Sequence, residues 1–537
     1  DYIPNECYKI LPPSWLHYLQ NLFNTIWRTE SIPTSWYKVK MILLHKKGDK
    51  KDPENYRGIA IFNAVVKIFT YIIYNRLALW AETNDLIPDE QMGFRKERGC
   101  RDAIFTLSAA ISIQLRLKRS KLFAIFVDFK RAFDSVNHQK LWQKLYDLGI
   151  CGKSLRILMN MYSHPVMLVS QGNELSSEID INEGVLQGEV LSPLLFALYI
   201  SDIVDFFVAY GAKGVSLSAN RDLNIISYAD DTVLLSPYWS DAQLNLNILE
   251  QYCNLNSLVV NINKTVVVPF HKGGRLPKFK DFFYKKSKIS VSNNVTYLGV
   301  PFSSSGVFRI AAKFFINKFS SANSAVLSIL RRIQSDSWEA KVSLFDSLAE
   351  SVLLYLSEVW GCPYSNVIER GQLLFFKALL RLPIQTPDAY VRLETSRTHC
   401  RLKIFKRMLG WWLHLLKSED SRIIKICYLR LAHFDNTFIN LIFNWYSHLK
   451  SYPVTISYDY LLINASYQSV SAVKKTILES YKNHLVCTDV NSVMNSSYNT
   501  YYRQISRLGL TEEYLWYKCD IEKIRVMAQI RLAGKKI

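Results

Sequence analysis

The spacing of apolar residues divides the chain into a mixed first part and a helical second part. Residues 122–127 are almost wholly apolar, which is typical of a short buried strand, and residues 65–79 have the apolar content of a core helix. From about residue 306, apolar side chains recur at helical intervals, for example at Leu344, Leu348 and Leu353. The pattern therefore predicts a region with a sheet, followed by a helical bundle.

At 537 residues the chain is long enough for several subdomains with an ample core. We expect a helical extension, a mixed region, a small antiparallel sheet backed by helices, a helical bundle and a mainly helical C-terminal region. Their predicted bounds are 1–37, 38–120, 121–305, 306–390 and 391–537. In the last region we interpret Trp411 and Trp412 as core residues, with stacking on nucleic-acid bases as the alternative.

Two adjacent carboxylates occupy a predicted turn. Asp230 and Asp231 lie between residues 223–228 and 232–235, two runs rich in β-branched and apolar types, so the segment predicts a β-hairpin. Like charges this close raise each other's pKa unless a cation compensates them, and the pair therefore indicates a divalent metal site. A solvated Asp-Asp turn is the alternative.

A further carboxylate, Asp128, follows the apolar run 122–127 directly. A buried strand that ends in a carboxylate places a metal ligand on a rigid element. Asp134 and Ser135 are interpreted as the start of a helix that Gly149 ends. Asp134 is therefore expected to cap this helix, and Asp128 to be the metal ligand.

A loop that leads into a helix lies between the two acidic segments. Ser192 and Pro193 have the residue types of an N-cap and a first helical turn. Shortly before them, Gln187 is followed by Gly188, and a glycine lets the backbone approach a flat or charged ligand closely.

Taken in order, these motifs resemble the reverse transcriptases of non-LTR, LINE-type retrotransposons. The resemblance rests on residues 126–134, Gln187 with Gly188, the Leu191-Ser192-Pro193 segment, and residues 228–231. It extends to segments that resemble further motifs of the family, at residues 55–59, 91–95, 258–261, 264–265 and 297–300.

The resemblance implies an α+β right-hand polymerase with an antiparallel palm sheet, mixed fingers and a helical thumb. Residues 38–120 would be the fingers, 121–305 the palm with part of the fingers, and 306–390 the thumb. The implied activity is RNA-directed DNA polymerisation, in which a DNA 3′-end at a nicked target is extended on an RNA template by two-metal nucleotidyl transfer. The alternative is a domesticated, non-catalytic scaffold that binds RNA.

The matching motifs also imply the site residues. Catalysis and metal binding are carried over to Asp128, Asp230 and Asp231. The residues expected to bind dNTP are Lys46, Lys47, Arg57, Phe129, Phe133, Gln187, Gly188 and Lys264, and Phe133 would leave no room for a 2′-hydroxyl. The residues expected to contact template or primer are Gln91, Phe94, Arg95, Tyr228, Tyr297, Leu298 and Gly299.

The cofactor implied is Mg²⁺, as two ions, and carboxylate ligands would also accept Mn²⁺. The expected partners are an RNA template, a DNA primer or target, dNTP, and the element's own transcript in an RNA–protein complex. The family implies intracellular action in the nucleus, with assembly in the cytoplasm as an alternative. The chain opens at Asp1 without Met, so we expect a part of a longer product.

The composition agrees with a nucleic-acid partner. The chain has 66 Lys and Arg against 46 Asp and Glu, a formal net charge of +20, and this field favours polyanions. No continuous apolar run of roughly 18 residues is present, which argues against a membrane as partner. The nine cysteines form no CxxC pair, so we expect free thiols and no zinc knuckle.

Overall fold

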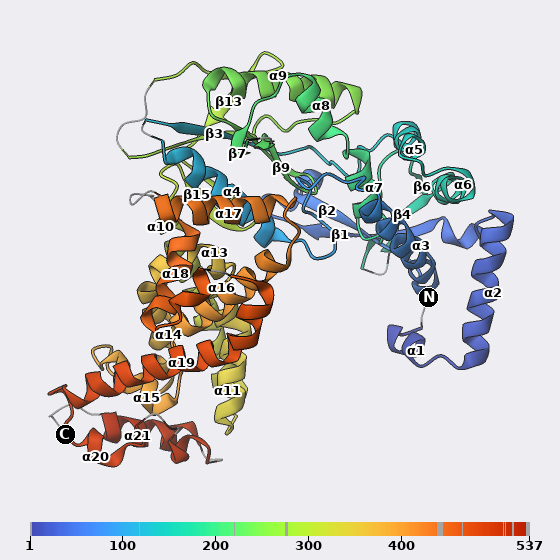
Figure 1. The fold of residues 1–537 in the computed structure, drawn as a ribbon. Helices are drawn as coiled ribbons and strands as arrows, with labels where there is room; N and C mark the ends of the chain where they lie inside the picture. The colour runs from blue at the N-terminus through green and yellow to red at the C-terminus, as the bar shows by residue number, and fades with distance from the viewer. Residues whose placement is uncertain are drawn as a thin grey trace.

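The computed structural model describes residues 3–532 apart from residues 118, 173, 220, 274–277, 334, 438–443, 464, 509, 511 and 518–519. It contains two main sheets, with helices packed around them and a large helical region that carries the second half of the chain (Figure 1). The α+β class expected from the sequence is confirmed.

The larger sheet has six strands in the order β12-β13-β11-β3-β10-β9. Its strands are β3 (Lys121–Val127), β9 (Ile225–Tyr228), β10 (Asp231–Ser236), β11 (Val266–His271), β12 (Phe282–Tyr284) and β13 (Ser287–Val291). From β9 to β11 the sheet is antiparallel as expected, but β13 runs parallel to β11. The chain reverses twice, into β12 and out of it, and therefore returns beside β11 in the original direction.

Strand β3 is apolar after its first residue, Lys121, because both faces of the sheet are covered. Leu122, Ala124 and Phe126 belong to one hydrophobic core, and Phe123 and Ile125 belong to the other. Successive side chains of a strand point to opposite faces, so a strand between two cores has no polar face. The prediction of a buried strand over residues 122–127 is confirmed.

The second sheet has five strands and joins two distant parts of the sequence. Its strands are β1 (Lys38–His45), β2 (Tyr56–Ile61), β4 (Val166–Gln171), β5 (Glu174–Leu175) and β6 (Ile179–Asp180). Strand β1 pairs antiparallel with β2 and parallel with β4. Two separate hairpins are formed by β7 (Val215–Ser218) with β8 (Arg221–Leu223), and by β14 (Asn294–Tyr297) with β15 (Val300–Ser303).

Helices surround the sheets in the first part of the chain. They are α1 (Asn5–Lys9), α2 (Pro13–Thr29), α3 (Ala64–Thr83), α4 (Cys100–Leu115), α5 (His138–Asp147), α6 (Gly152–Met161), α7 (Ser192–Tyr199), α8 (Ile203–Ala209) and α9 (Trp239–Leu255), with short turns η1 (Thr34–Trp36) and η2 (Pro53–Asn55). The helix predicted after Asp134 begins later, because Asn137 is its N-cap and accepts the main-chain N–H of Lys140. Gly149 ends it with φ 91° as predicted.

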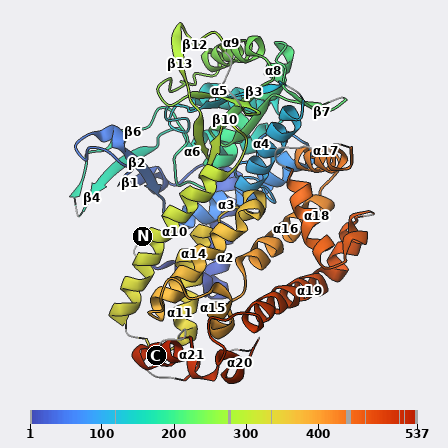
Figure 2. The same ribbon diagram turned by 90° about the vertical axis from the view of Figure 1, so that its left-hand side faces the viewer.

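The second part of the chain is helical, as predicted. Its helices are α10 (Arg309–Ile333), α11 (Trp338–Phe345), α12 (Ser351–Leu353), α13 (Ser357–Trp360), α14 (Ser365–Leu379), α15 (Asp388–Thr395), α16 (Cys400–Lys417), α17 (Ile423–Thr437), α18 (Trp445–Thr455), α19 (Tyr467–Met494), α20 (Tyr502–Ile505) and α21 (Ile521–Leu532). Short helical segments are η3 (Asp346–Glu350), η4 (Cys362–Tyr364), η5 (Asp459–Leu462) and η6 (Glu513–Leu515). The long α10 descends from the sheet region along this bundle (Figure 2).

The C-terminal helices share a core with the six-stranded sheet. In α4, Phe105 packs edge-on against Trp411 and Trp445, with ring centroids 5.3 Å apart in each pair. Trp411 and Trp412 are fully buried, which confirms the core interpretation over the stacking one. Helix α4 therefore lies between the sheet and helices α16 and α17, as Figure 1 shows.

Among the described residues, two segments are long and apolar enough, by length and composition alone, to cross a membrane. They are Ala64–Thr83 and Ser192–Ala209. Neither is a continuous apolar run, because charged residues such as Arg76 and Asp202 interrupt them. In Ser192–Ala209, 61% of the apolar window is buried inside the protein, as in the core helices of proteins that do not enter membranes. Eight cysteines fall in the described part of the chain, and all are free thiols, as expected.

Candidate active site

Asp230 and Asp231 lie at the tip of the predicted hairpin. Strands β9 and β10 pair antiparallel, with Tyr228 opposite Asp231, so Ala229 and Asp230 form a two-residue turn. Ala229 has φ 56°, in the left-handed region that a residue with a Cβ atom seldom adopts. This backbone conformation must be held by its surroundings, because it is strained on its own.

Asp128 leaves the end of β3 beside this turn. Val127 pairs with Thr232, so the next residue of β3 faces Asp231 across the ladder. The main chain of Asp128 is fixed on its other side, where Thr265 Oγ1 accepts its N–H at 3.2 Å and its carbonyl accepts the N–H of Asn261 at 2.7 Å. Asp128 and Asp231 line one cavity of about 120 Å³.

The three carboxylates interact through space. Burial, and then the charges of Asp230 and Asp128, raise the pKa of Asp231 to about 6. Burial is also the main cause that raises the pKa of Asp230, and the charge of Asp128 adds to it, whereas a main-chain hydrogen bond and Arg57 lower it. Like charges in a partly desolvated site cost free energy unless a cation joins them.

The donor set suits a hard divalent cation, because it offers carboxylate oxygens alone. In the part of the chain that the structure describes, however, no three acidic, histidine or cysteine side chains lie close enough together to hold an ion. The carboxylates therefore interact electrostatically without forming a closed ligand shell. Such an open arrangement leaves positions for water and for a substrate oxygen.

Three of the expected cations lie around the carboxylates. Lys264 Nζ is 3.8 Å from Asp128 Oδ2, and this lysine side chain is 67% exposed. Arg57, on strand β2, is exposed, and its charge opposes the rise that burial causes in the pKa of Asp230. Burial also raises the pKa of nearby Asp134, and the charges of Lys46, just past the end of β1, and of Arg57 oppose that rise. Lys47 is exposed, and no side-chain contact places it at the acids.

Phe133 packs against α7, and the Gln187–Gly188 segment packs against strand β2. The half-buried ring of Phe133 stacks on Phe196, with centroids 4.8 Å apart. The carbonyl of Gln187 accepts the main-chain N–H of Ala60 in β2 at 2.7 Å. Gly188 has φ 110°, and a Cβ atom there would lie 2.5 Å from the carbonyl oxygen of Ala60. The glycine thus permits the close approach of strand β2, rather than only that of a ligand.

Four predicted contact residues are buried, so little of their side chains is accessible to a substrate. Phe129, Gln91, Arg95 and Tyr297 are only 6%, 2%, 8% and 4% exposed, respectively. The ring of Phe129 belongs to a hydrophobic core, and that of Tyr297 packs against Phe126. Sequence motifs mark such positions as important, but they do not separate residues that touch a substrate from residues that support the site.

The other predicted template or primer residues are accessible. Phe94 is 51% exposed, and its ring centroid lies 6.3 Å from that of the half-buried Tyr228. Leu298 and Gly299 form the two-residue turn of the β14–β15 hairpin, with φ 45° and 80°. The hydroxyl of Tyr355 donates to the carbonyl of Leu298 at 3.2 Å. Leu298 and Gly299 thus lie at the tip of a hairpin, and their contact with a primer stays a prediction.

The sequence reasoning missed Glu189, which replaces Ser192 as the cap of α7. One carboxylate oxygen of Glu189 accepts the main-chain N–H groups of Leu191 and Ser192 at 2.6 and 2.9 Å. The side chain is buried, and burial raises its pKa. An acidic residue just before a helix is a recognisable signal, since carboxylates favour helix N-termini.

Comparisons with known proteins agree with this geometry. Residues 44–302 match the family described as "Reverse transcriptase (RNA-dependent DNA polymerase)". Among curated proteins, the chain is 25% identical over 448 residues to the "Probable RNA-directed DNA polymerase from transposon BS" of Drosophila melanogaster, covering 79% of this chain and 48% of that protein. It is 24% identical over 392 residues to the "RNA-directed DNA polymerase from mobile element jockey" of the same species, covering 71% of this chain and 41% of the relative.

The chain thus spans less than half the length of these two relatives. Among solved structures, it is similar to a telomerase from Candida tropicalis in complex with a fragment of telomeric RNA. That match has 14% identity and a TM-score of 0.38, and it covers 81% of this chain and 68% of the telomerase.

Proposed function

We propose that the chain is a LINE-type reverse transcriptase that extends a DNA 3′-end on an RNA template. The observation that carries the proposal is the convergence of Asp128 with Asp230 and Asp231 at the end of the six-stranded sheet. The mutual repulsion of these carboxylates has a chemical use only if cations bind there during the reaction.

Asp128, Asp230 and Asp231 would hold two divalent ions, with Mg²⁺ as the expected metal. Bound cations would supply charge stabilisation for the attacking 3′-hydroxyl and the leaving oxygen at the α-phosphate. The protein's own part is to orient the substrates. Arg57 and Lys264, which act on Asp230 and Asp128, would neutralise triphosphate charge that the carboxylates repel, and Lys46 would assist them.

Phe133 would select dNTP over ribonucleotides. Its ring is stacked on that of Phe196, so it would have little freedom to move aside for a 2′-hydroxyl. The RNA template and DNA primer would be held by the exposed side of the site around Phe94 and Tyr228. Priming at a nicked chromosomal target, association with the element's own transcript and action in the nucleus are further parts of the proposal.

The test is incorporation of labelled dNTP on a primed RNA template by the purified chain. Asp128→Ala and Asp230→Ala should abolish extension and leave template binding nearly intact. The matched control is Asp281→Asn, which removes an exposed carboxylate that pairs with Lys288 at the edge of the same sheet. Extension by either alanine variant at the wild-type rate would refute the assignment.

A non-catalytic RNA-binding scaffold is the competing function. Such a protein has no need for three repelling carboxylates, because ionised groups that raise each other's pKa weaken both folding and the binding of a polyanion. RNA binding by the wild-type chain without any incorporation of dNTP or NTP, in Mg²⁺ and in Mn²⁺, would select the scaffold.

A further inference from the structure

The strained residue of the acidic turn is held by one side chain from a distant segment. Gln91 Oε1 accepts the main-chain N–H of Ala229 at 2.8 Å, and Gln91 Nε2 donates to the carbonyl of Ala229 at 3.2 Å. Both main-chain polar groups of the residue with φ 56° are thus paired with a single buried amide. Leaving such groups unpaired in a buried turn would be costly, so the amide favours this one turn conformation.

The segment that carries Gln91 is itself fixed against the hairpin. The main-chain N–H of Met92 donates to the carbonyl of Ser227, and the N–H of Ser227 donates to the carbonyl of Glu90, each at 2.8 Å. Gln91 Oε1 also accepts the N–H of Gly93 at 3.0 Å. Residues 90–93 therefore lie along strand β9 and end at the turn.

Gly93 makes the contact between this segment and the turn very close. A Cβ atom built on Gly93 would lie 2.3 Å from the main-chain nitrogen of Ala229 and 2.9 Å from the carbonyl carbon of Tyr228. No side chain larger than a hydrogen atom fits there without a shift of the backbone. The absence of a Cβ atom at Gly93 is thus required for Gln91 to reach the turn.

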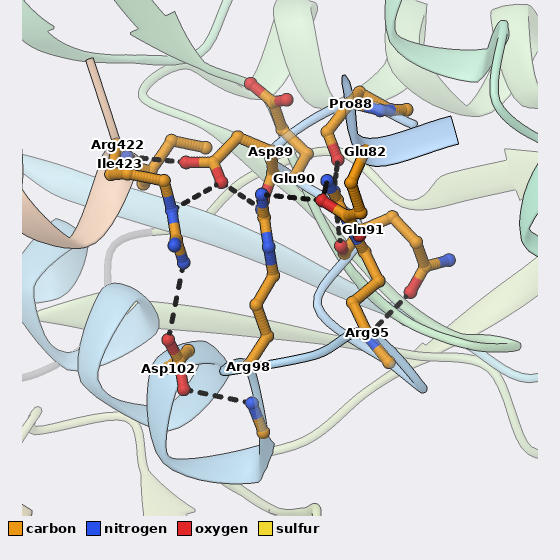
Figure 3. Close-up of polar contacts among 12 residues, drawn as sticks. Glu82, Pro88, Asp89, Glu90, Gln91, Arg95, Arg98, Asp102, Arg422 and Ile423 are labelled. Carbon is orange, nitrogen blue, oxygen red and sulfur yellow. Dashed lines mark hydrogen bonds and ion pairs between the residues drawn. The ribbon is translucent and has the colours of Figure 1, made fainter. Parts of the chain in front are cut away.

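Arg95 and Asp89 anchor the same segment on its far side. The guanidinium of Arg95 makes two hydrogen bonds of 2.7 Å to the carboxylate of Glu82, and it also donates to the carbonyls of Pro88 and Gln91 (Figure 3). Asp89 contacts Arg98 and Arg422, and it accepts the first main-chain N–H of α17, that of Ile423, at 2.6 Å. A series of contacts therefore connects the acidic turn to the C-terminal helices through residues 89–98.

We propose that Gln91 is a positioning residue for polymerisation: it fixes the main chain of Ala229 and thereby the directions in which Asp230 and Asp231 project. Gln91 is too deeply buried to touch nucleic acid, so its effect passes through the turn. This inference rests on the proposed function as far as catalysis is concerned. The effect of the Gln91 hydrogen bonds on the main chain of Ala229 can be tested even if the chain does not polymerise DNA.

The experiment compares the full-length chain with Gln91→Met and Gln91→Glu. Methionine keeps the length of the side chain and removes all three hydrogen bonds, whereas glutamate keeps the acceptor for the N–H groups of Ala229 and Gly93. Gln243→Met is the matched control, because the Gln243 amide pairs with the N–H and carbonyl of Phe283 at the opposite edge of the sheet. The readouts are kcat, the KM for dNTP, the Mg²⁺ concentration for half-maximal extension, thermal unfolding, and hydrogen exchange of residues 225–233.

For Gln91→Met we expect kcat to fall about 100-fold, as for a reacting group misplaced by about 1 Å. The Mg²⁺ requirement should rise, and the KM for dNTP should change little, since the groups that bind dNTP stay in place. The Ala229 amide should exchange about tenfold faster. Gln91→Glu should lie between wild type and Gln91→Met in kcat, and Gln243→Met should match wild type in kcat and in the exchange of residues 225–233.

The inference is overturned if Gln91→Met keeps the kcat, Mg²⁺ requirement and Ala229 exchange of wild type. It is equally overturned if kcat falls only in proportion to a loss of folded protein. If wild type incorporates no dNTP, the proposed function fails instead. The exchange rate at Ala229 then still decides whether Gln91 clamps the turn.

Discussion

Lys264 Nζ lies 3.8 Å from Asp128 Oδ2, so a cation already stands beside one of the three carboxylates before any substrate arrives. Both side chains are solvent-exposed to a substantial degree, which makes the pair weak and easily exchanged. Under the proposed function, Lys264 would release Asp128 to a metal ion and pair with the triphosphate instead.

Lys264→Met should separate these two uses of the lysine charge. Without the competing ammonium group, Mn²⁺ should bind about two- to fivefold more tightly in the absence of dNTP, the range expected for an exposed ion pair. The KM for dNTP should rise, because triphosphate charge loses a partner. Titration with Mn²⁺ by electron paramagnetic resonance and steady-state extension measure the two effects, and a weaker Mn²⁺ affinity would contradict the competition.

Phe133→Val should relax the choice of sugar. The smaller side chain opens space where the ring now stacks on Phe196, so ribonucleotides gain access while dNTP binding persists. We expect the preference for dNTP over NTP, measured as the ratio of kcat/KM values, to fall about 10- to 100-fold. Phe206→Leu is the control. Phe206 is a half-buried aromatic residue of α8 that stacks on Tyr210, and its replacement should leave the dNTP-to-NTP ratio of kcat/KM unchanged.

Asp231→Asn should stabilise the metal-free protein at neutral and alkaline pH. Because the pKa of Asp231 is raised to about 6 in the fold from an ordinary 3.8, its ionisation costs stability as the pH rises through this interval. The variant should unfold with a free energy higher by up to about 1 kcal/mol above pH 6, since water screens an exposed group. Denaturant unfolding in EDTA should show this difference vanish below about pH 4.

Gly93→Ala should disturb the acidic turn through the backbone alone. The added methyl group would meet the main chain of Ala229, and either segment must move, at a cost of about 1–3 kcal/mol in unfolding free energy. Extension should fall with it, even at temperatures where the variant is fully folded. In Gly410→Ala the new methyl group meets nothing within 4 Å inside α16, and this control should stabilise by about 0.5–1 kcal/mol.

Arg422→Ala should loosen the junction between α4, the residue 89–98 segment and α17. The Arg422 guanidinium lies 2.9 Å from the carboxylate of Asp89 and 3.6 Å from that of Asp102. Both carboxylates are largely buried, and each loses one ionic partner when the guanidinium is removed. We expect the free energy of unfolding to fall by about 3 kcal/mol in denaturant titrations. Arg381→Ala is the control, since its pair with Glu522 is half-exposed on both sides and should be worth less than about 1 kcal/mol.

Local patterns predicted the elements of the site well. Two runs of β-branched and apolar residues around a polar turn predicted the hairpin at Asp230. The apolar run 122–127 predicted the buried strand that leads into Asp128. These features depend on near neighbours in sequence, so periodicity and turn chemistry suffice to find them.

Contacts between residues far apart in the sequence could not be predicted from local patterns. Gln91 and Arg95 have the polar side chains of ligand-binding residues, and only the fold shows that they pair with Ala229 and Glu82 inside the protein. Residues 491–506 are rich in Asn, Ser and Tyr, a composition that favours a flexible connection. Tyr502 within this stretch is fully buried and donates to Glu394, a partner 108 residues away that no local pattern could indicate.

The enclosure of α4 bears on how the molecule can move when nucleic acid enters. A helix buried on one side by the sheet and on the other by α16 and α17 cannot serve as a sliding surface, because close-packed side chains do not deform continuously. The acid-bearing sheet and the C-terminal helices therefore resist sliding past each other at α4. Arg57, in contrast, belongs to the other sheet through the β1–β2 hairpin, and its charge acts on Asp230 from outside this shared core.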